Sequence, residues 1–363
     1  MGKEIKIILT GGGTAGPVMP LVAVYQAFKE RKIKADFLFI GTEKGPENKI
    51  CASYKIPFRA IPAGKLRRYL SLKNFSDPFK VLKGYREAKY ILGVAEPDVI
   101  FSAGGFVAVP VIWAARKQNM PVLIHQQDIR KGLANKMTEK IAEKITVTFE
   151  KSLAEFPREK TVLTGNPVRL DILAGNRAKA VKEFDLNENL PTLLVFGGGT
   201  GAENINKKVN KIAEELVKFC NLIHLTGPGK KGAALKDKNY HVYEMLTDKM
   251  KDALAVADLV VSRAGLCALS EFSALAKPAI IIPIAGSHQE ENAAFYEKEG
   301  AVMVFRENIL RPELLLSTIR GLLENPRKIE ELKENIHKLY KPEAADRIID
   351  IIIKISDKHS DEC

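Results

Sequence analysis

Cysteine and histidine are scarce in this chain, which has four cysteines and six histidines among 363 residues. The cysteines are scattered without C-x-x-C spacing, and no two histidines form an H-x-x-x-H pair. A disulfide framework and a metal site are therefore not expected, and the cysteine usage fits a reducing cytosol. The cysteines are Cys51, Cys220, Cys267 and Cys363.

Long apolar runs are missing as well. No run approaches the roughly 20 residues that a membrane span needs. The first residues, MGKEIKIIL, lead directly into a strand-like run, so no signal peptide is expected. Lys6 stands where a myristoylation signal needs Ser or Thr, which argues against that lipid anchor.

Basic residues are in excess, and the formal net charge is +12. Such a charge attracts anionic partners, which include nucleic acids, anionic lipids and phosphorylated substrates. No nucleic-acid-binding motif is present, so nucleic acid is not an expected partner. Apolar residues make up 46% of the chain, and its length suggests about two domains.

A glycine-rich turn occurs twice. Residues 11–16 read GGGTAG after the apolar run 5–9, and residues 197–202 read GGGTGA after the apolar run 193–196. Each run is typical of a buried parallel strand, and each turn leads into a helical pattern. A strand, glycine turn and helix can hold a phosphate on backbone N–H groups at the helix N-terminus. Two copies predict two nucleotide-binding folds.

The rest of the chain alternates between strand and helix, which predicts an α/β fold with parallel sheets covered by helices on both faces. We expect an N-terminal domain over residues 1–166 and a C-terminal domain over residues 167–342. A final helix, residues 343–357, is expected to pack back on the first domain. Further strands are predicted at 37–40, 58–61, 99–101, 122–125, 145–149, 222–225, 242–245, 259–262, 279–284 and 302–305.

The most informative stretch is residues 258–293, DLVVSRAGLCALSEFSALAKPAIIIPIAGSHQEENA. It predicts a strand, a turn at 263–265, and a helix that carries Glu271. The turn can hold a diphosphate on the N–H groups at the start of the helix. A carboxylate about two turns into the helix can accept hydrogen bonds from both hydroxyls of a ribose. Gln289 and Asn292 open the next helix and can bind sugar hydroxyls.

These segments together resemble the MurG family of bacterial transferases, which add N-acetylglucosamine to lipid I, a lipid-linked muramyl peptide. The resemblance runs in order through GGGTAGPVMPLVAV, SAGGFVAVP, IHQQD with GLANK, LTGNPVR, LLVFGGGTGAENIN, DLVVSRAGLCALSE and HQEENA. It implies the glycosyltransferase B fold, with two Rossmann-like domains facing a cleft. It also implies an inverting transfer from UDP-N-acetylglucosamine that uses no cofactor and no metal, since a helix dipole can stabilise the departing UDP.

The resemblance implies roles for individual residues. The donor-binding set would be Arg169, Gly198, Gly199, Thr200, Thr247, Arg263, Gly265, Leu266, Glu271, Gln289 and Asn292. The acceptor-binding set, which would hold the acceptor's diphosphate, would be Gly13, Thr14, Gly16, Gly104 and Gly105.

The chain departs from the family pattern at three places. Pro17 stands where the family usually has a histidine that is thought to help deprotonate the acceptor hydroxyl. The family's HEQN turn is HQQD here, with Gln126 for Glu and Asp128 for Asn, and Ala268 replaces a hydroxyl residue near the diphosphate. Because proline cannot act as a base, we expect His125 or Asp128 to take this role.

Residues 65–89 interleave basic and apolar side chains, a pattern that can rest on an anionic membrane face. A lipid-linked acceptor has to be met at such a surface, so a peripheral position on the cytoplasmic face of the cell membrane is expected. The alternative is a solvated amphipathic helix packed on its own sheet. The residues expected at the membrane are Lys65, Arg67, Arg68, Leu72, Phe75 and Phe79.

Two other functions are compatible with the same fold. A UDP-N-acetylglucosamine 2-epimerase would turn over the sugar nucleotide without an acceptor. The basic apolar segment argues against this function. The lack of the acidic and histidine residues that an epimerase needs in the cleft also argues against it. A nucleotide-sugar-binding protein that has lost its base would bind the donor without releasing UDP, and Pro17 motivates this hypothesis.

Overall fold

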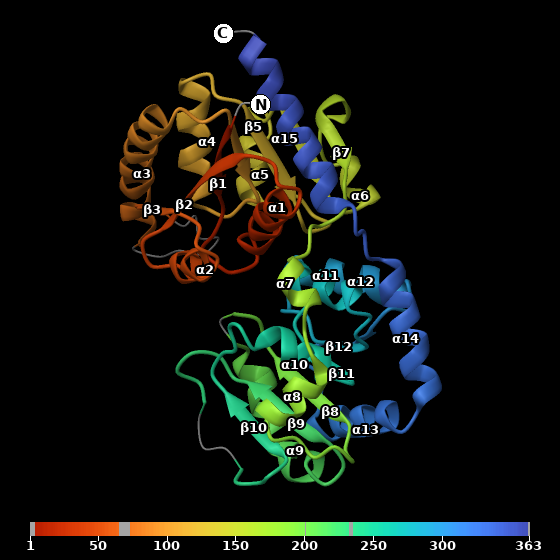
Figure 1. Ribbon diagram of the computed structural model, residues 1–363. Coiled ribbons are helices and arrows are strands. Elements are labelled where there is room, and N and C mark those ends of the chain that lie inside the picture. The colour runs from red at the N-terminus through yellow and green to blue at the C-terminus, as the bar shows by residue number, and fades with distance from the viewer. Residues whose placement is uncertain (1–3, 65–72, 200, 232–234, 362–363) are drawn as a thin grey trace. The chain divides into compact units, whose positions relative to one another are not determined.

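The computed structural model describes residues 4–64, 73–199, 201–231 and 235–361. The chain forms two compact units, one made of Met1–Arg169 with Lys341–Cys363 and the other of Leu170–Tyr340 (Figure 1). The division thus lies after Arg169 rather than after residue 166, and the last segment joins the first unit from Lys341 onward.

Alternating strands and helices build the first unit. Its strands are β1 (Ile5–Thr10), β2 (Ala35–Thr42), β3 (Phe58–Ile61), β4 (Val99–Ser102), β5 (Val122–Gln126), β6 (Lys144–Val147) and β7 (Thr161–Leu163). Its helices are α1 (Met19–Glu30), α2 (Glu47–Ser53), α3 (Lys73–Ala95), α4 (Ala108–Lys117), α5 (Leu133–Thr138), α6 (Glu150–Leu153) and α15 (Ala344–Asp361). The strands form one parallel sheet in the order β3-β2-β1-β4-β5-β6-β7.

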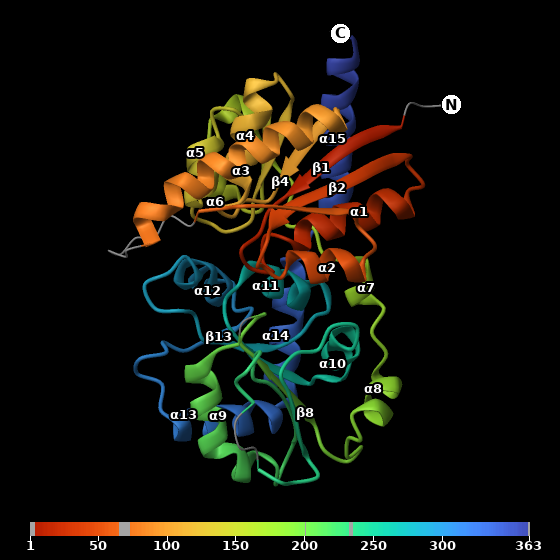
Figure 2. The ribbon, with the colours of Figure 1, turned by 90° about the vertical axis from the view of Figure 1, so that its left-hand side faces the viewer.

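Helices cover both faces of this sheet because successive residues of a strand point to opposite faces. In β1, Ile7 and Leu9 face a core shared with α1 and α15, whereas Ile8 faces a core shared with α3 and α4. Figure 1 shows α1 and α15 on one side of the sheet and α3 and α4 on the other, and Figure 2 views the same unit from its α3 side.

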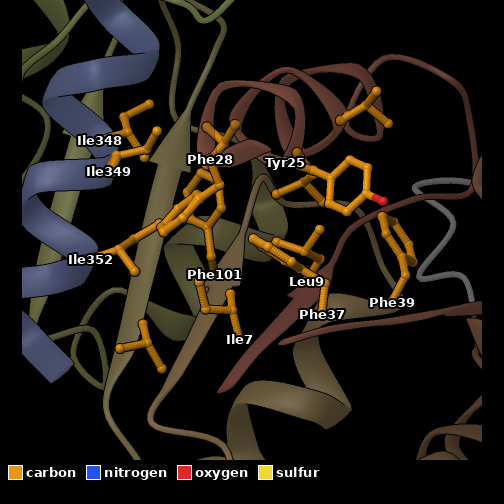
Figure 3. Close-up of a cluster of buried hydrophobic side chains, with 14 of the residues drawn as sticks. Ile7, Leu9, Tyr25, Phe28, Phe37, Phe39, Phe101, Ile348, Ile349 and Ile352 are labelled. Atoms are coloured by element: carbon orange, nitrogen blue, oxygen red, sulfur yellow. The ribbon is translucent and has the colours of Figure 1, made fainter. Parts of the chain in front are cut away.

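The core beside α15 joins segments from the two ends of the chain. Ile348, Ile349 and Ile352 pack with aromatic side chains of α1 and of the strands (Figure 3). Phe37 meets Tyr25 and Phe28 edge to face, with ring centroids 5.1 and 5.3 Å apart. Isoleucines of α15 are therefore part of the first unit's hydrophobic core.

The second unit repeats the architecture. Its strands are β8 (Thr192–Phe196), β9 (Asn221–Leu225), β10 (Tyr240–Tyr243), β11 (Leu259–Ser262), β12 (Ala279–Ile281) and β13 (Met303–Val304), in the parallel order β10-β9-β8-β11-β12-β13. Its helices are α7 (Leu170–Leu173), α8 (Arg177–Glu183), α9 (Glu203–Leu216), α10 (Met250–Val256), α11 (Leu266–Ala274), α12 (Gln289–Lys298), α13 (Pro312–Leu323) and α14 (Pro326–Lys338). The prediction of an α/β protein with two parallel sheets is confirmed.

Several predicted strand bounds were wrong. The strand expected at 242–245 begins at Tyr240 and ends at Tyr243, and the strand expected at 279–284 ends at Ile281. The strands expected at 145–149 and 302–305 end at Val147 and Val304. β7 was not predicted, since three half-buried residues give too short a pattern. Among the described residues, no helix is long and apolar enough to cross a membrane.

Candidate active site

In each unit the strand order reverses beside a strand that ends in a glycine turn. The reversal lies between β1 and β4 in the first sheet and between β8 and β11 in the second. Ligands of open parallel sheets bind outside the carboxyl ends of the strands at this point. The turns there are residues 11–16 and 103–105 in the first unit, and 197–202 and 263–265 in the second.

The two turns of the first unit pack backbone against backbone. Gly13, Gly104 and Gly105 have φ angles of +87°, +85° and +86°, which side-chain-bearing residues rarely adopt. A Cβ on Gly105 would overlap the backbone of Gly12. The Gly104 N–H donates to Ser102 Oγ at 3.1 Å. Of the predicted acceptor-binding residues, Gly13, Gly104 and Gly105 are thus brought together, and Thr14 and Gly16 continue the same turn, Thr14 being exposed.

Glu47, the first residue of α2, occupies the inner side of the first turn. Its side chain is fully buried, and its carboxylate accepts hydrogen bonds from the Gly13 N–H and from Thr42 Oγ1, the latter at 3.0 Å. The amide of Gly13, which was predicted to bind the acceptor's diphosphate, is therefore engaged within the protein. Glu47 was not predicted, because a glutamate at a helix start is common and no motif links it to a turn so far away in the sequence.

The turn after β5 is ordered by Gln126. Its Nε2 donates to the carbonyl oxygens of Asp128 and Arg130 at 2.8 and 2.7 Å, and its Oε1 accepts from Asn135 Nδ2 at 2.8 Å and from the Gly132 N–H at 3.2 Å. A glutamate at this position could not donate to the two carbonyls. Gln126 thus fixes the backbone that carries the half-buried Asp128.

His125 lies inside the sheet rather than at its edge. The ring is fully buried, with Nδ1 2.9 Å from Thr146 Oγ1 and Nε2 3.0 Å from Asn166 Oδ1. Burial lowers the pKa of His125 to about 4. A ring that is closed to solvent, with both nitrogens hydrogen-bonded, cannot reach a substrate hydroxyl in this conformation. The environment therefore argues against the expectation that His125 is the base.

In the second unit, the tip of the glycine turn is open. Gly198 and Gly199 are exposed, and a Cβ added to Gly198, whose φ is +81°, would meet open space. Thr200, predicted to bind the donor, lies outside the described residues. Gly201 closes the turn against the carbonyl of Thr226, where a Cβ would overlap.

Arg263 has a structural role that the sequence analysis did not anticipate. Its guanidinium donates to the carbonyl oxygens of Ile282 and Pro283 at 3.0 and 3.3 Å and forms an ion pair with Glu307. The residue is buried. These contacts tie the turn before α11 to the residues that follow β12 and to Glu307, so the guanidinium predicted to bind the donor is used within the unit.

Asn292 supports the same turn from α12. It is fully buried, and its Nδ2 donates to the Ala264 carbonyl at 3.2 Å. Gln289 is half-buried, and its Oε1 accepts from the Ile284 N–H at 3.2 Å. Both predicted sugar-binding residues thus make internal contacts, and their proposed role in binding rests on the resemblance alone.

Glu271 lies on α11 beyond this turn and is buried. The half-buried Cys267, one helical turn earlier, donates from Sγ to Glu271 Oε1 at 3.7 Å. Gly265 caps the N-terminus of α11, and Leu266, its first residue, is buried. The helix N-terminus and the carboxylate are thus on one element, as a diphosphate with a ribose beyond it would require.

The remaining predicted site residues lie outside these turns. Arg169 belongs to the first unit, where its Nη1 donates to the Tyr54 hydroxyl at 2.8 Å. Thr247 is exposed in the loop after β10. Lys65, Arg67, Arg68 and Leu72, expected at a membrane, lie outside the described residues, as does the side chain of Phe75; Phe79 is 76% exposed.

Both units match one family of known proteins. The glycosyltransferase family 28 N-terminal domain matches residues 7–147, and the family 28 C-terminal domain matches residues 192–348. The chain is 41% identical over 355 residues to a protein of Lachnoclostridium phytofermentans, covering 96% of this chain and 99% of that one. That relative is named UDP-N-acetylglucosamine–N-acetylmuramyl-(pentapeptide) pyrophosphoryl-undecaprenol N-acetylglucosamine transferase.

Solved structures agree on the fold. The crystal structure of Acinetobacter baumannii MurG matches with a TM-score of 0.69 at 24% identity, covering 96% of this chain and 99% of that one. The UDP-GlcNAc 2-epimerase of Neisseria meningitidis bound to UDP-GlcNAc matches with a TM-score of 0.68 at 15% identity, covering 97% and 100%. A transferase and an epimerase therefore share this architecture, so the fold does not distinguish between the two activities. The sequence relative described above is named as a transferase.

Two buried histidines should make stability depend on pH. His224 in the second unit resembles His125, with Nδ1 2.9 Å from the Tyr240 hydroxyl and Nε2 3.1 Å from Asn206 Oδ1, and burial lowers its pKa to about 4. Because the unfolded chain binds the proton more readily, stability is complete above the unfolded pKa of about 6.5 and falls as the pH drops towards 4. Each ring should cost about 2 kcal/mol between pH 7 and pH 5.

Urea denaturation of the wild type and of His224→Gln at both pH values measures this effect. The variant should be less stable at pH 7, yet lose less stability on acidification than the wild type. His288→Gln, at an exposed histidine, should keep the wild-type pH dependence. An unchanged pH dependence in His224→Gln would contradict the assignment.

Proposed function

The chain belongs to glycosyltransferase family 28, and we propose that it transfers N-acetylglucosamine from UDP-N-acetylglucosamine to lipid I in peptidoglycan synthesis, giving lipid II. The observation that supports this function best is the 41% identity, over nearly the full length of both chains, to a relative named for this reaction. This sequence identity favours the transferase over the epimerase, because the epimerase structures resemble this chain in fold but share little of its sequence.

The donor is assigned to the second unit. The N-terminus of α11 faces the donor's diphosphate, Glu271 accepts from the ribose hydroxyls, and the exposed Gly198 and Gly199 flank the nucleotide. Thr247 lies against the uracil, and Gln289 is assigned to the sugar. The acceptor is assigned to the turns 11–16 and 103–105 of the first unit.

The reaction is an inverting displacement. The acceptor hydroxyl attacks the anomeric carbon, the bond from that carbon to the diphosphate oxygen breaks, and UDP leaves with the electron pair. The positive end of the α11 dipole stabilises the charge that develops on UDP. The hydroxyl proton passes to a base, and the product is β-linked.

Asp128 is the better of the two candidates for this base. It lies half-buried just after β5, at the carboxyl edge of the sheet that also bears the two acceptor turns. Gln126 holds its backbone in place. His125, by contrast, is enclosed by Thr146 and Asn166. The carboxylate therefore takes the role that Pro17 cannot perform.

UDP release, measured with UDP-N-acetylglucosamine in the presence and absence of a lipid I analogue, tests the function. We expect release that depends on the acceptor. Glu271→Gln should raise the KM for the donor about 10- to 100-fold, since a hydrogen bond to a charged group is worth about 1.5–3 kcal/mol. Glu334→Gln, at an exposed carboxylate on α14, should match the wild type.

The outcomes separate the alternatives. Conversion of UDP-N-acetylglucosamine in the absence of acceptor, measured as loss of the donor, would favour the epimerase. Donor binding with no UDP release in the presence of acceptor would favour a binding protein without catalytic activity.

Asp128→Asn tests the base in the same assay. The variant keeps the side-chain shape but loses proton acceptance, so kcat should fall about 10²- to 10⁴-fold with little change in donor KM. Asp98→Asn is the matched control, because Asp98 accepts from the Lys6 N–H at the opposite edge of the same sheet. Turnover close to wild type in Asp128→Asn would eliminate Asp128 as the base.

The solvent side of α3 supports a position at an anionic membrane. Phe79, Leu82, Tyr90 and Val94 are 76%, 49%, 74% and 69% exposed, and they share one side of the helix with Lys83 and Arg86. The opposite side, with Ala88 and Leu92, is buried in the core. An apolar stripe flanked by cations suits the headgroup region of an anionic bilayer, where a lipid-linked acceptor is found.

Sedimentation with phosphatidylglycerol-containing vesicles tests this surface. The wild type should bind these vesicles at low salt and dissociate from them as the salt concentration rises. It should not bind vesicles of pure phosphatidylcholine. Lys83→Glu with Arg86→Glu should weaken binding more than about 10-fold. The charge-matched pair Lys182→Glu and Lys211→Glu, exposed on helices of the second unit, should not. Equal binding by both pairs would refute the α3 surface.

A further inference from the structure

Glu47 is a buried charge that the proposed chemistry does not use. Its carboxylate lies beneath the first glycine turn of the first unit, 34 residues away in sequence from the amide it binds. Within the described part of the chain, its charge is met by the Gly13 N–H and the Thr42 hydroxyl rather than by a cation. A carboxylate removed from water is costly unless such donors hold it.

Three glycines make the room for this side chain. A Cβ on Gly12 or on Gly45 would overlap the Glu47 carboxylate, and a Cβ on Gly41 would lie 3.1 Å from Glu47 Cβ. Two of these glycines belong to the loop between β2 and α2 or to the end of β2, whereas Gly12 belongs to the turn itself. The carboxylate therefore occupies a fitted space formed by two separate segments.

The hydrogen bond fixes the conformation of the turn. Gly13 has a φ of +87°, and its N–H is directed to Glu47, so the carboxylate takes the place that an external anion would take on this amide. Gly12 in turn supports Gly105 of the neighbouring turn, where the backbones meet. Glu47 thus binds the turn that packs directly on the second acceptor turn.

We propose that Glu47 is a positioning residue of the acceptor site, which holds residues 11–16 in the shape that receives the acceptor. It acts through the Gly13 amide and does not touch the substrate. The exposed Thr14 and the residues after it, rather than the Gly13 amide, are then the part of the turn that meets the acceptor. The inference rests on the proposed transferase function for its acceptor.

Kinetics of Glu47 variants with a lipid I analogue test the proposal. Glu47→Ala should lower kcat/KM for the acceptor about 100-fold, the loss expected when a site is misplaced by about 1 Å, and leave the KM for UDP-N-acetylglucosamine unchanged. Glu47→Gln keeps an acceptor for the Gly13 N–H and should stay within about threefold of wild type, since a neutral bond is roughly half as strong as a charged one. Thr42→Val should have little further effect in the Glu47→Ala background.

A core variant separates positioning from mere stability. Ile352→Ala destabilises the same unit through the core that α15 shares with α1 and the strands. Its acceptor KM should remain that of wild type. If Glu47→Ala shows the same pattern as Ile352→Ala, or if Glu47→Gln is as impaired as Glu47→Ala, the proposal is wrong.

Amide hydrogen exchange of residues 10–17 gives a readout that needs no substrate. Exchange there should be slow in wild type and Glu47→Gln and fast in Glu47→Ala, while Ile352→Ala should not change it selectively. Failure of wild type to use lipid I would refute the proposed function, and exchange would still decide whether Glu47 positions the turn. Equal exchange in wild type and Glu47→Ala would overturn the inference.

Discussion

The absence of a Cβ at the crossing of two turns is the constraint on which the first unit's site depends. β1 and β4 are neighbours, so the segments that leave them must pass each other at the carboxyl edge of the sheet. They pass in contact because Gly12 and Gly105 present bare backbone to each other. Any side chain at Gly105 would push the turns apart. The second unit meets the same constraint where Gly201 closes on Thr226.

Each unit also carries a fully buried histidine inside its sheet. His125 on β5 and His224 on β9 both have their two ring nitrogens engaged by neighbouring side chains. In the second unit the partner Asn206 also donates to the Thr226 carbonyl at 2.8 Å, which links the ring to the strand end beneath the glycine turn. Polar groups buried in this way specify one arrangement of the strands, because any other arrangement leaves them unpaired.

The sequence predicted what depends on neighbours along the chain. Apolar runs such as residues 5–9 and 193–196 marked the central strands, and the glycine turns that follow them were placed correctly at the strand ends. The strand predicted to reach residue 284 stops at Ile281, where its pairing with β11 ends. The prediction was too long because the apolar residues continue beyond this last pair. The final helix was expected on the first domain, and its isoleucines do lie in that unit's core.

What depends on contacts between distant residues was not predictable in the same way. Arg263 reads as a cation beside a phosphate-binding turn, and only the fold shows that Glu307 and two carbonyls engage it. Gln126 stood out as a departure from the family, yet its four hydrogen bonds could not be predicted, because they depend on the folded conformation of the turn. Glu47 left no signal at all, since Gly13, whose amide it binds, lies 34 residues away in the sequence.

The packing of α15 against α1 has a consequence for synthesis on the ribosome. Residues 170–340 form the second unit from one continuous stretch, whereas the first unit needs Ile348, Ile349 and Ile352 to fill the core beside β1. The first 169 residues therefore emerge with an apolar face that stays uncovered while the whole second unit is being made. Domains generally fold as units during translation, so here the order of completion is the reverse of the order of synthesis.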